Sequence, residues 1–363
     1  MDLGFLTVPL TMAAMAFGFA VVTDTQTVHI DRISVPGAVS GATGYTPDVV
    51  INRLADEMHE IEHQAQSRAQ ARAIQLQGEK NALIVLADFL KVTPLIRVAQ
   101  ETAGLIPFSF NGEIVTRGKD LEMVLRGYDA EQKPKYIITR APADQIPVLI
   151  KSTAYEAMRV IDPYILAAYQ FKKDFKTRDF TPTVDIIQRQ LAEKDPQYTK
   201  WMYNLWGMVL YQQADRVGAI EKFRAALAAD PNFASAMLNW GVVLARQGNN
   251  QDAIEKYQHV IYDHWGDASA ATMAAAYSEW GFSLALLGRT DDAFARFHDA
   301  TTTDPTFAEV YVSWAEVLSA LGKGNEADRK SKKALQLAPT EVIYTENLIG
   351  PVQHLPATAS VVN

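Results

Sequence analysis

The sequence predicts an α+β N-terminal domain followed by an all-α solenoid of helix pairs, with one N-terminal transmembrane helix. Three observations support this prediction. Residues 3–22 carry no charge, β-branched and alternating segments fall within 24–150, and residue columns recur at a fixed period within 200–340. We expect a helical connector at 151–199 and a flexible tail at 341–363.

Composition limits the classes of function. The chain has 363 residues, of which 48% are hydrophobic, and a formal net charge of −8. This content supports a buried core, whereas the acidic balance argues against nucleic-acid binding, which needs a basic surface. Because the chain has no cysteine, disulfides, thiol catalysis and cysteine-ligated zinc are excluded. We expect no cofactor.

Residues 1–23 are expected to form a membrane anchor, because about twenty uncharged helical residues span the hydrocarbon core of a bilayer. Two alternatives stay open. One is a cleaved secretory signal with its cleavage site near 18–20, and the other is a buried helix of a soluble protein. The first basic residue is Arg32, so charge asymmetry does not set the orientation.

The segment 24–150 opens with a predicted strand at 28–35, rich in β-branched residues. The Gly/Ser-rich stretch 36–44 is expected to be a loop. A Thr-Pro-Asp sequence then supplies the N-cap, first-turn proline and first-turn acid of a helix at 46–72.

Further along, two alternating segments flank Arg117-Gly118, which predicts a β-hairpin. The remaining expected elements are a buried strand at 82–89, a short helix at 93–104, a strand at 135–140, and helices at 148–162 and 163–175.

Residue columns recur along 200–340. A Trp-Gly column and an alanine column both step by 34, 40 and 34 residues, which indicates repeated units with an insertion at 263–272. An aromatic column and a terminal proline column share the period. The first two columns are Trp206-Gly207, Trp240-Gly241, Trp280-Gly281 and Trp314-Ala315, then Ala219, Ala253, Ala293 and Ala327. The aromatic column is Phe223, Tyr257 and Phe297, with Ser331 in the fourth unit.

A 34-residue unit with a small residue at the helix crossing and a proline at its end resembles the tetratricopeptide repeat (TPR). The resemblance implies four helix-turn-helix units over 200–340, and we interpret 185–201 as containing the second helix of a degenerate fifth. The stretch from the first predicted strand to Asp162-Pro163-Tyr164 resembles the small membrane-proximal α+β module of bacterial membrane-anchored TPR proteins.

In that family the first helices of the units line a groove that binds segments of other proteins. The resemblance therefore implies protein partners and a partner-binding groove. Mapped by register, the groove residues are Asn204, Met208, Tyr211, Asn239, Val242, Arg246, Glu279, Phe282 and Glu316.

The groove departs from the family pattern in two ways. Asn239 matches the family position for an asparagine that contacts a bound backbone, but Leu205, Glu279 and Ser313 stand there in the other units. Arg246 is the lone cation, so the family's paired basic clamp for a carboxylate is missing. We expect an apolar or somewhat basic ligand segment.

One motif favours a different function. His59, Glu60 and His63 have the H-E-x-x-H spacing of zinc peptidases, in which the histidines hold the metal and the glutamate acts as base. At the helical step both histidines fall opposite an apolar stripe, and Glu62 places a charge beside the second. Position 69 is alanine, where an extended motif would place a third histidine. The stripe comprises Val50, Leu54, Met58, Ile61 and Ala65.

We therefore predict a non-enzymatic scaffold or assembly factor, held in the bacterial inner membrane by residues 3–22 with its soluble part in the periplasm. Two alternatives are kept. One is a membrane-bound zinc metallopeptidase that uses the 59–63 motif, and the other is a structural subunit of a larger membrane complex.

Overall fold

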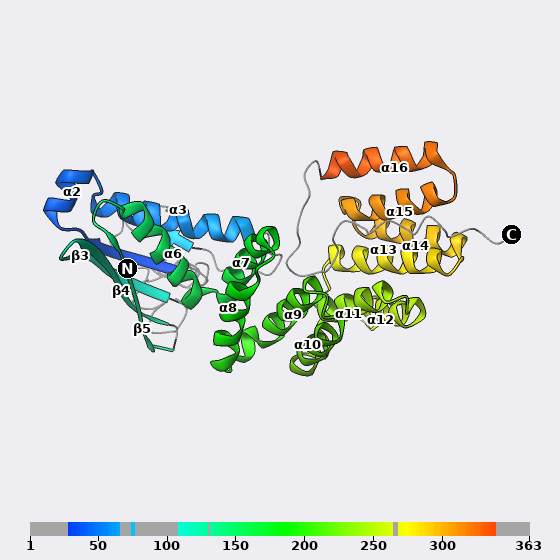
Figure 1. Ribbon diagram of the computed structural model, residues 1–363, viewed down its shortest axis with the longest axis horizontal. Coiled ribbons are helices and arrows are strands. Elements are labelled where there is room, and N and C mark those ends of the chain that lie inside the picture. The colour runs from blue at the N-terminus through cyan, green and yellow to red at the C-terminus, as the bar shows by residue number, and fades with distance from the viewer. Residues whose placement is uncertain (1–27, 66–73, 77–107, 130, 264–267, 339–363) are drawn as a thin grey trace, which may run out of the picture. The chain divides into compact units, whose positions relative to one another are not determined.

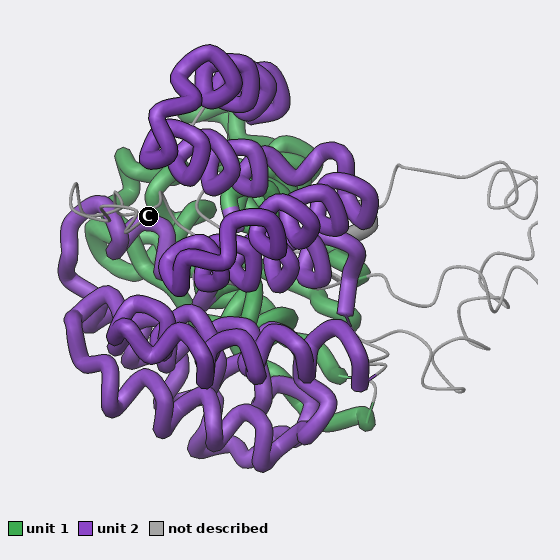
Figure 2. The backbone as a smooth tube through the Cα atoms, turned by 90° about the vertical axis from the view of Figure 1, so that its right-hand side faces the viewer, with its two compact units in different colours: residues 1–64, 69–166 green, residues 65–68, 167–363 purple. Residues whose placement is uncertain are grey.

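The computed structural model describes residues 28–65, 74–76, 108–129, 131–263 and 268–338. It divides into two compact units, residues 1–64 with 69–166 and residues 65–68 with 167–363 (Figure 2). Within the described ranges, no helix is long and apolar enough to cross a membrane. The predicted anchor at 3–22, the strand at 82–89 and the helix at 93–104 lie outside these ranges.

The first unit contains a five-stranded sheet of order β2-β1-β3-β4-β5 (Figure 1). β1 is parallel to β2 and β3, while β3, β4 and β5 form an antiparallel meander. The strands at 28–35 and 135–140 and the hairpin at Gly118, with φ 65°, are confirmed, whereas β2 was not predicted. The strands are β1 Val28–Ser34, β2 Ile74–Leu76, β3 Phe108–Arg117, β4 Asp120–Asp129 and β5 Pro134–Pro142.

The predicted loop at 36–44 is wrong, because α2 occupies Gly37–Thr43. Pro36 directly precedes the helix, and Gly44 ends it at φ 77°, where its N–H donates to the Ser40 carbonyl. The first and last glycines of this stretch, Gly37 and Gly44, therefore stand at the helix boundaries, where glycine is well tolerated. The loop prediction treated these glycines as helix breakers.

Four further helices precede the repeats. α3 spans Pro47–Ala65, and its predicted N-cap Thr46 accepts the N–H of Val49 at 3.4 Å. α6, Ile146–Ile161, crosses the domain boundary expected at residue 150 and packs on β4 and β5. α7, Pro163–Thr177, and α8, Thr181–Ala192, lead into the repeats.

The second unit contains four helix pairs, which confirms the predicted TPR architecture (Figure 1). Within each pair a short turn joins two helices that pack along their length, and each pair also contacts the next. α8 packs on α9, as expected for the second helix of a preceding degenerate unit. The pairs are α9 Pro196–Gln212 with α10 Arg216–Ala229, α11 Ala234–Arg246 with α12 Asn250–Tyr262, α13 Ala270–Leu286 with α14 Thr290–Thr303, and α15 Ala308–Ala320 with α16 Gly324–Leu337.

Close crossing of the two helices explains the glycine and aromatic columns. A Cβ on Gly207 would lie 2.5 Å from the Phe223 ring, and one on Gly241 would lie 2.5 Å from the Tyr257 ring. In the third unit the corresponding distance, from Gly281 to Phe297, is 2.9 Å. The fourth unit has no ring at this place, because Ser331 replaces it, and Ala315 replaces the glycine. The glycine column and the aromatic column therefore change together in the fourth unit.

A further column pairs each repeat tryptophan with a cation on the second helix of its own unit. Lys222 lies 3.9 Å from the centre of the Trp206 ring, and Lys330 lies 3.1 Å from that of Trp314. The other two pairs are Lys256 over Trp240 at 4.7 Å and Arg296 over Trp280 at 4.8 Å. Such contacts contribute about 0.5–2 kcal/mol each.

The helix crossing can be tested with one substitution at two glycines. Gly207→Ala should lower the free energy of unfolding by about 1–3 kcal/mol, because the added methyl group overpacks the crossing. Gly324→Ala, at the open start of α16, has no atom within 4 Å of its Cβ and should be neutral or slightly stabilising. Urea unfolding measures both, and equal effects would contradict the packing account.

Candidate functional site

The nine predicted groove residues lie on the first helices of the four pairs, α9, α11, α13 and α15. Three are half-buried: Tyr211, Arg246 and Glu316. Six are buried: Asn204, Met208, Asn239, Val242, Glu279 and Phe282. The prediction by register does not give the depth of each side chain, which depends on packing between neighbouring units.

Asn239 lies in the interface between the first two units. Its Nδ2 donates to Oδ1 of Asn204 at 2.8 Å, and both side chains are fully buried. This bond joins α11 to α9, so Asn239 has a structural role between the units whatever else it contacts.

Arg246 and Glu279 form an ion pair that joins the second unit to the third. Two guanidinium nitrogens of Arg246 each lie 3.3 Å from a different Glu279 oxygen, and the side chains are 14% and 4% exposed. Glu279 raises the pKa of Arg246, so this arginine stays charged. The guanidinium also lies 5.8 Å from the Phe282 ring centre.

Glu316 adds a second carboxylate from the fourth unit. Burial raises its pKa from 4.5 to about 7, with Arg246 opposing and Glu279 reinforcing the rise. Its Oε2 atom is buried and has no hydrogen-bond partner among the described residues. Arg246 is already paired with Glu279, so the three side chains together carry one negative charge when Glu316 is ionised.

Two hydroxyl groups that the sequence did not predict, those of Tyr257 and Ser283, lie near these charged side chains. Tyr257 of α12 is fully buried, and the charge of Glu279 acts on its hydroxyl. The Ser283 hydroxyl is near enough to affect the pKa of Tyr257, but the two do not meet in hydrogen-bonding geometry, and both lack a partner in the described part of the chain. The available signal was the aromatic column, in which Tyr257 replaces phenylalanine.

We name Arg246, Glu279, Glu316, Tyr257 and Ser283 the groove polar cluster. It combines one satisfied ion pair with a buried carboxylate oxygen and two buried hydroxyls that have no described partner. Buried polar atoms in native proteins are normally hydrogen-bonded. The cluster can therefore accept hydrogen bonds at the carboxylate and both accept and donate them at the hydroxyls.

The H-E-x-x-H motif lies apart from this cluster, on α3 of the first unit. His59, Glu60 and His63 are exposed, and the predicted apolar stripe is buried on the other side of the helix. No group of three or more metal-ligating side chains occurs within the described ranges. Glu62 is half-buried, and burial followed by the charge of Asp162 raises its pKa to about 7.

No protein-family model matches the chain, and no curated protein matches it. Similar solved structures include MamA, with 22% identity over 46% of this chain and 92% of that one and a TM-score of 0.34. Pseudomonas aeruginosa PilF has 16% identity over 51% and 78%, with a TM-score of 0.40. YrrB, described as a TPR protein with an unusual peptide-binding site, has 19% identity over 51% and 91%, with a TM-score of 0.32.

The ion pair can be tested by a double-mutant cycle. Arg246→Met should lower the free energy of unfolding by about 3–5 kcal/mol, because it leaves the Glu279 carboxylate buried without its cation. The double variant with Glu279→Gln should recover most of this loss. Urea unfolding followed by tryptophan fluorescence gives the coupling energy, and strictly additive losses would contradict a pair.

Glu316 predicts a pH-dependent stability. Because the pKa of Glu316 is raised in the folded chain, the protonated side chain stabilises the folded state. This contribution is fully present below pH 4.5 and is lost as pH rises through 7. Glu316→Gln should therefore raise Tm at pH 8, and the difference from wild type should shrink towards pH 4. The matched control Glu326→Gln, at an exposed position of α16, should show no such trend. A constant difference across pH would contradict the assignment.

Proposed function

We propose that this protein is a membrane-anchored scaffold or assembly factor of the bacterial envelope, whose TPR groove binds a partner segment that carries a lysine or arginine. The observation that carries the groove proposal is the buried, unpaired Oε2 atom of Glu316 beside an arginine that is already paired. The anchor and the periplasmic location rest on residues 3–22 and on the resemblance stated from the sequence.

A basic side chain fits the groove polar cluster for three reasons. It neutralises the remaining negative charge, it donates hydrogen bonds to a buried acceptor, and it leaves the Arg246–Glu279 pair in place. An acidic side chain would meet two carboxylates and only one cation. An apolar side chain would cover Glu316 without donating to it, which costs free energy for a buried polar atom.

A neighbouring aromatic residue gives the ligand a further contact. Tyr211 is half-buried and lies near the charge of Arg246, whereas Phe282 is buried against the Arg246 guanidinium. Aromatic residues contribute strongly at protein interfaces. The ligand segment is therefore expected to combine one basic residue with adjacent apolar residues.

The test selects peptides that bind the full chain from a displayed library of random 12-residue peptides. Enriched peptides should share a lysine or arginine, and the synthetic peptide should lose about tenfold or more in affinity towards Glu316→Gln, because a charge-assisted contact contributes about 1.5–3 kcal/mol. Affinity should also fall below pH 7, because protonation of Glu316 removes the charge. Glu326→Gln serves as the matched control.

Two results would contradict the proposal, and each would overturn a different part of it. Enriched peptides that bind Glu316→Gln as well as wild type would leave groove binding in place but overturn the role of Glu316. A selection that enriches nothing would overturn groove binding and favour a structural subunit or spacer.

A further inference from the structure

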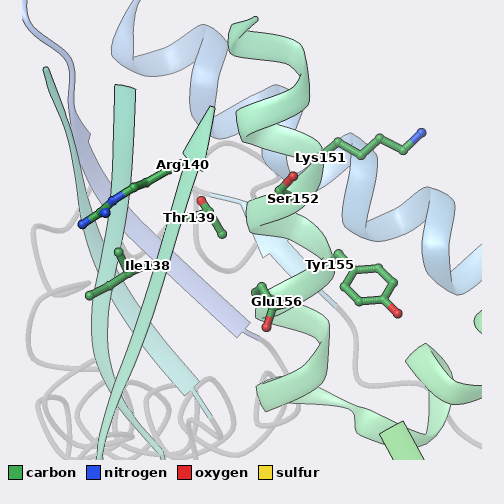
Figure 3. Close-up of a pocket in the computed structure, with 7 residues that line it drawn as sticks. All are labelled: Ile138, Thr139, Arg140, Lys151, Ser152, Tyr155 and Glu156. Atoms are coloured by element: carbon green, nitrogen blue, oxygen red, sulfur yellow. The ribbon is translucent and has the colours of Figure 1, made fainter. Parts of the chain in front are cut away.

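A second interaction surface lies in the first unit, where β5 is the edge strand of the described sheet. An open pocket of about 450 Å³ runs between this strand and α6 (Figure 3). Its lining comes from three consecutive strand residues and two helical turns: Ile138, Thr139, Arg140, Lys151, Ser152, Tyr155 and Glu156. A groove between an edge strand and a helix is a place where another strand can add to the sheet.

One face of this edge strand exposes two large side chains with apolar surface. Tyr136 is 65% exposed and Ile138 is 58% exposed, both on the sheet face opposite α6. Figure 3 shows the Arg140 side chain pointing away from α6 as well. Open edge strands are normally protected by charges, prolines or a covering element. β5 carries two charges, and each is paired within its own chain, Lys135 with Asp129 and Arg140 with Glu122. Its prolines stand only at its ends, residues 134 and 142.

We propose that β5 pairs with β5 of a second copy of this chain, antiparallel about a two-fold axis through Ile138. Ile138 is the midpoint of the strand, so this register pairs all nine residues. Ile138 then faces its own copy, and Tyr136 faces Arg140 of the second copy, which gives an apolar pair and two cation–π pairs. The strand is therefore complementary to itself.

The residues of α6 that line the pocket are self-complementary about the same axis. Lys151 and Glu156 lie symmetrically about a point between residues 153 and 154, and so do Ser152 and Tyr155. An antiparallel pair of α6 helices therefore places each Lys151 opposite a Glu156 of the other copy. Thr153 at this centre hydrogen-bonds Thr139, next to Ile138, so one axis serves both elements.

The position of α6 also agrees with this pairing. α6 packs mainly on β5 and also on β4. Pairing two β5 strands would therefore bring the two α6 helices side by side on one face of the joined sheet. The dimer thus forms a continuous sheet with two contacting helices on one face.

Cysteine cross-linking tests the register, because the natural chain has no cysteine. Ile138→Cys in the full chain should form a disulfide-linked dimer under mild oxidation, since directly opposite residues have Cα atoms about 4.5–5.5 Å apart. Tyr136→Cys is the matched control. It is equally exposed, but its two copies would lie about 14 Å apart, and it should stay uncross-linked.

A charge exchange tests the helix contact. Lys151→Glu should raise the dimer dissociation constant about tenfold or more in sedimentation equilibrium, because like charges then face each other. Adding Glu156→Lys should restore the wild-type value, which a local effect on folding would not do. A monomeric chain, equal cross-linking at 136 and 138, or a dimer that resists Lys151→Glu would each overturn the proposal. The groove plays no part in this test.

Discussion

The repeat region depends on one steric constraint, the close crossing of the two helices in each unit. The absence of a Cβ at Gly207, Gly241 and Gly281 lets an aromatic ring of the second helix lie against the backbone of the first. This contact sets the distance between the two helices of the first three units. In the same units the second-helix cation lies over the tryptophan ring.

The fourth unit shows that the constraint concerns volume and not glycine as such. Ser331 removes the ring, Ala315 adds a methyl group, and the helix pair α15–α16 still forms. Lys330 keeps its place over Trp314 as well. The tryptophan–cation pair and the crossing are therefore separate contributions, and each unit can lose one while keeping the other.

Much of this fold could be predicted from the sequence because its columns report local volume. Glycine and an aromatic residue that recur together at a fixed spacing indicate two helices in close contact. The cation column was missed because lysines such as Lys222 are ordinary on an exposed helix, and only the three-dimensional contact makes them significant. α2 was missed for the opposite reason, since its glycines look like breakers until Gly44 is seen to end a helix.

The candidate site was predicted less completely than the fold. Register assigned Arg246, Glu279 and Glu316 to the predicted groove, and the structure brings these three charges together across three units. The repeat register does not predict how deeply each side chain is buried, because burial depends on how neighbouring units pack over it. Tyr257 was not predicted as a site residue because it belongs to a second helix. Its side chain is fully buried, and the charge of Glu279 acts on its hydroxyl.

A dimer built on β5 would carry two of the proposed partner-binding grooves, and a partner with two basic segments could bind both. Linking two weak contacts raises overall affinity by about 10²–10⁴ when the geometry allows simultaneous binding. A single cluster around Glu316 offers only a few polar contacts, which by itself suits a weak and reversible interaction. Avidity is therefore the physical route by which such a modest site could hold an assembly together.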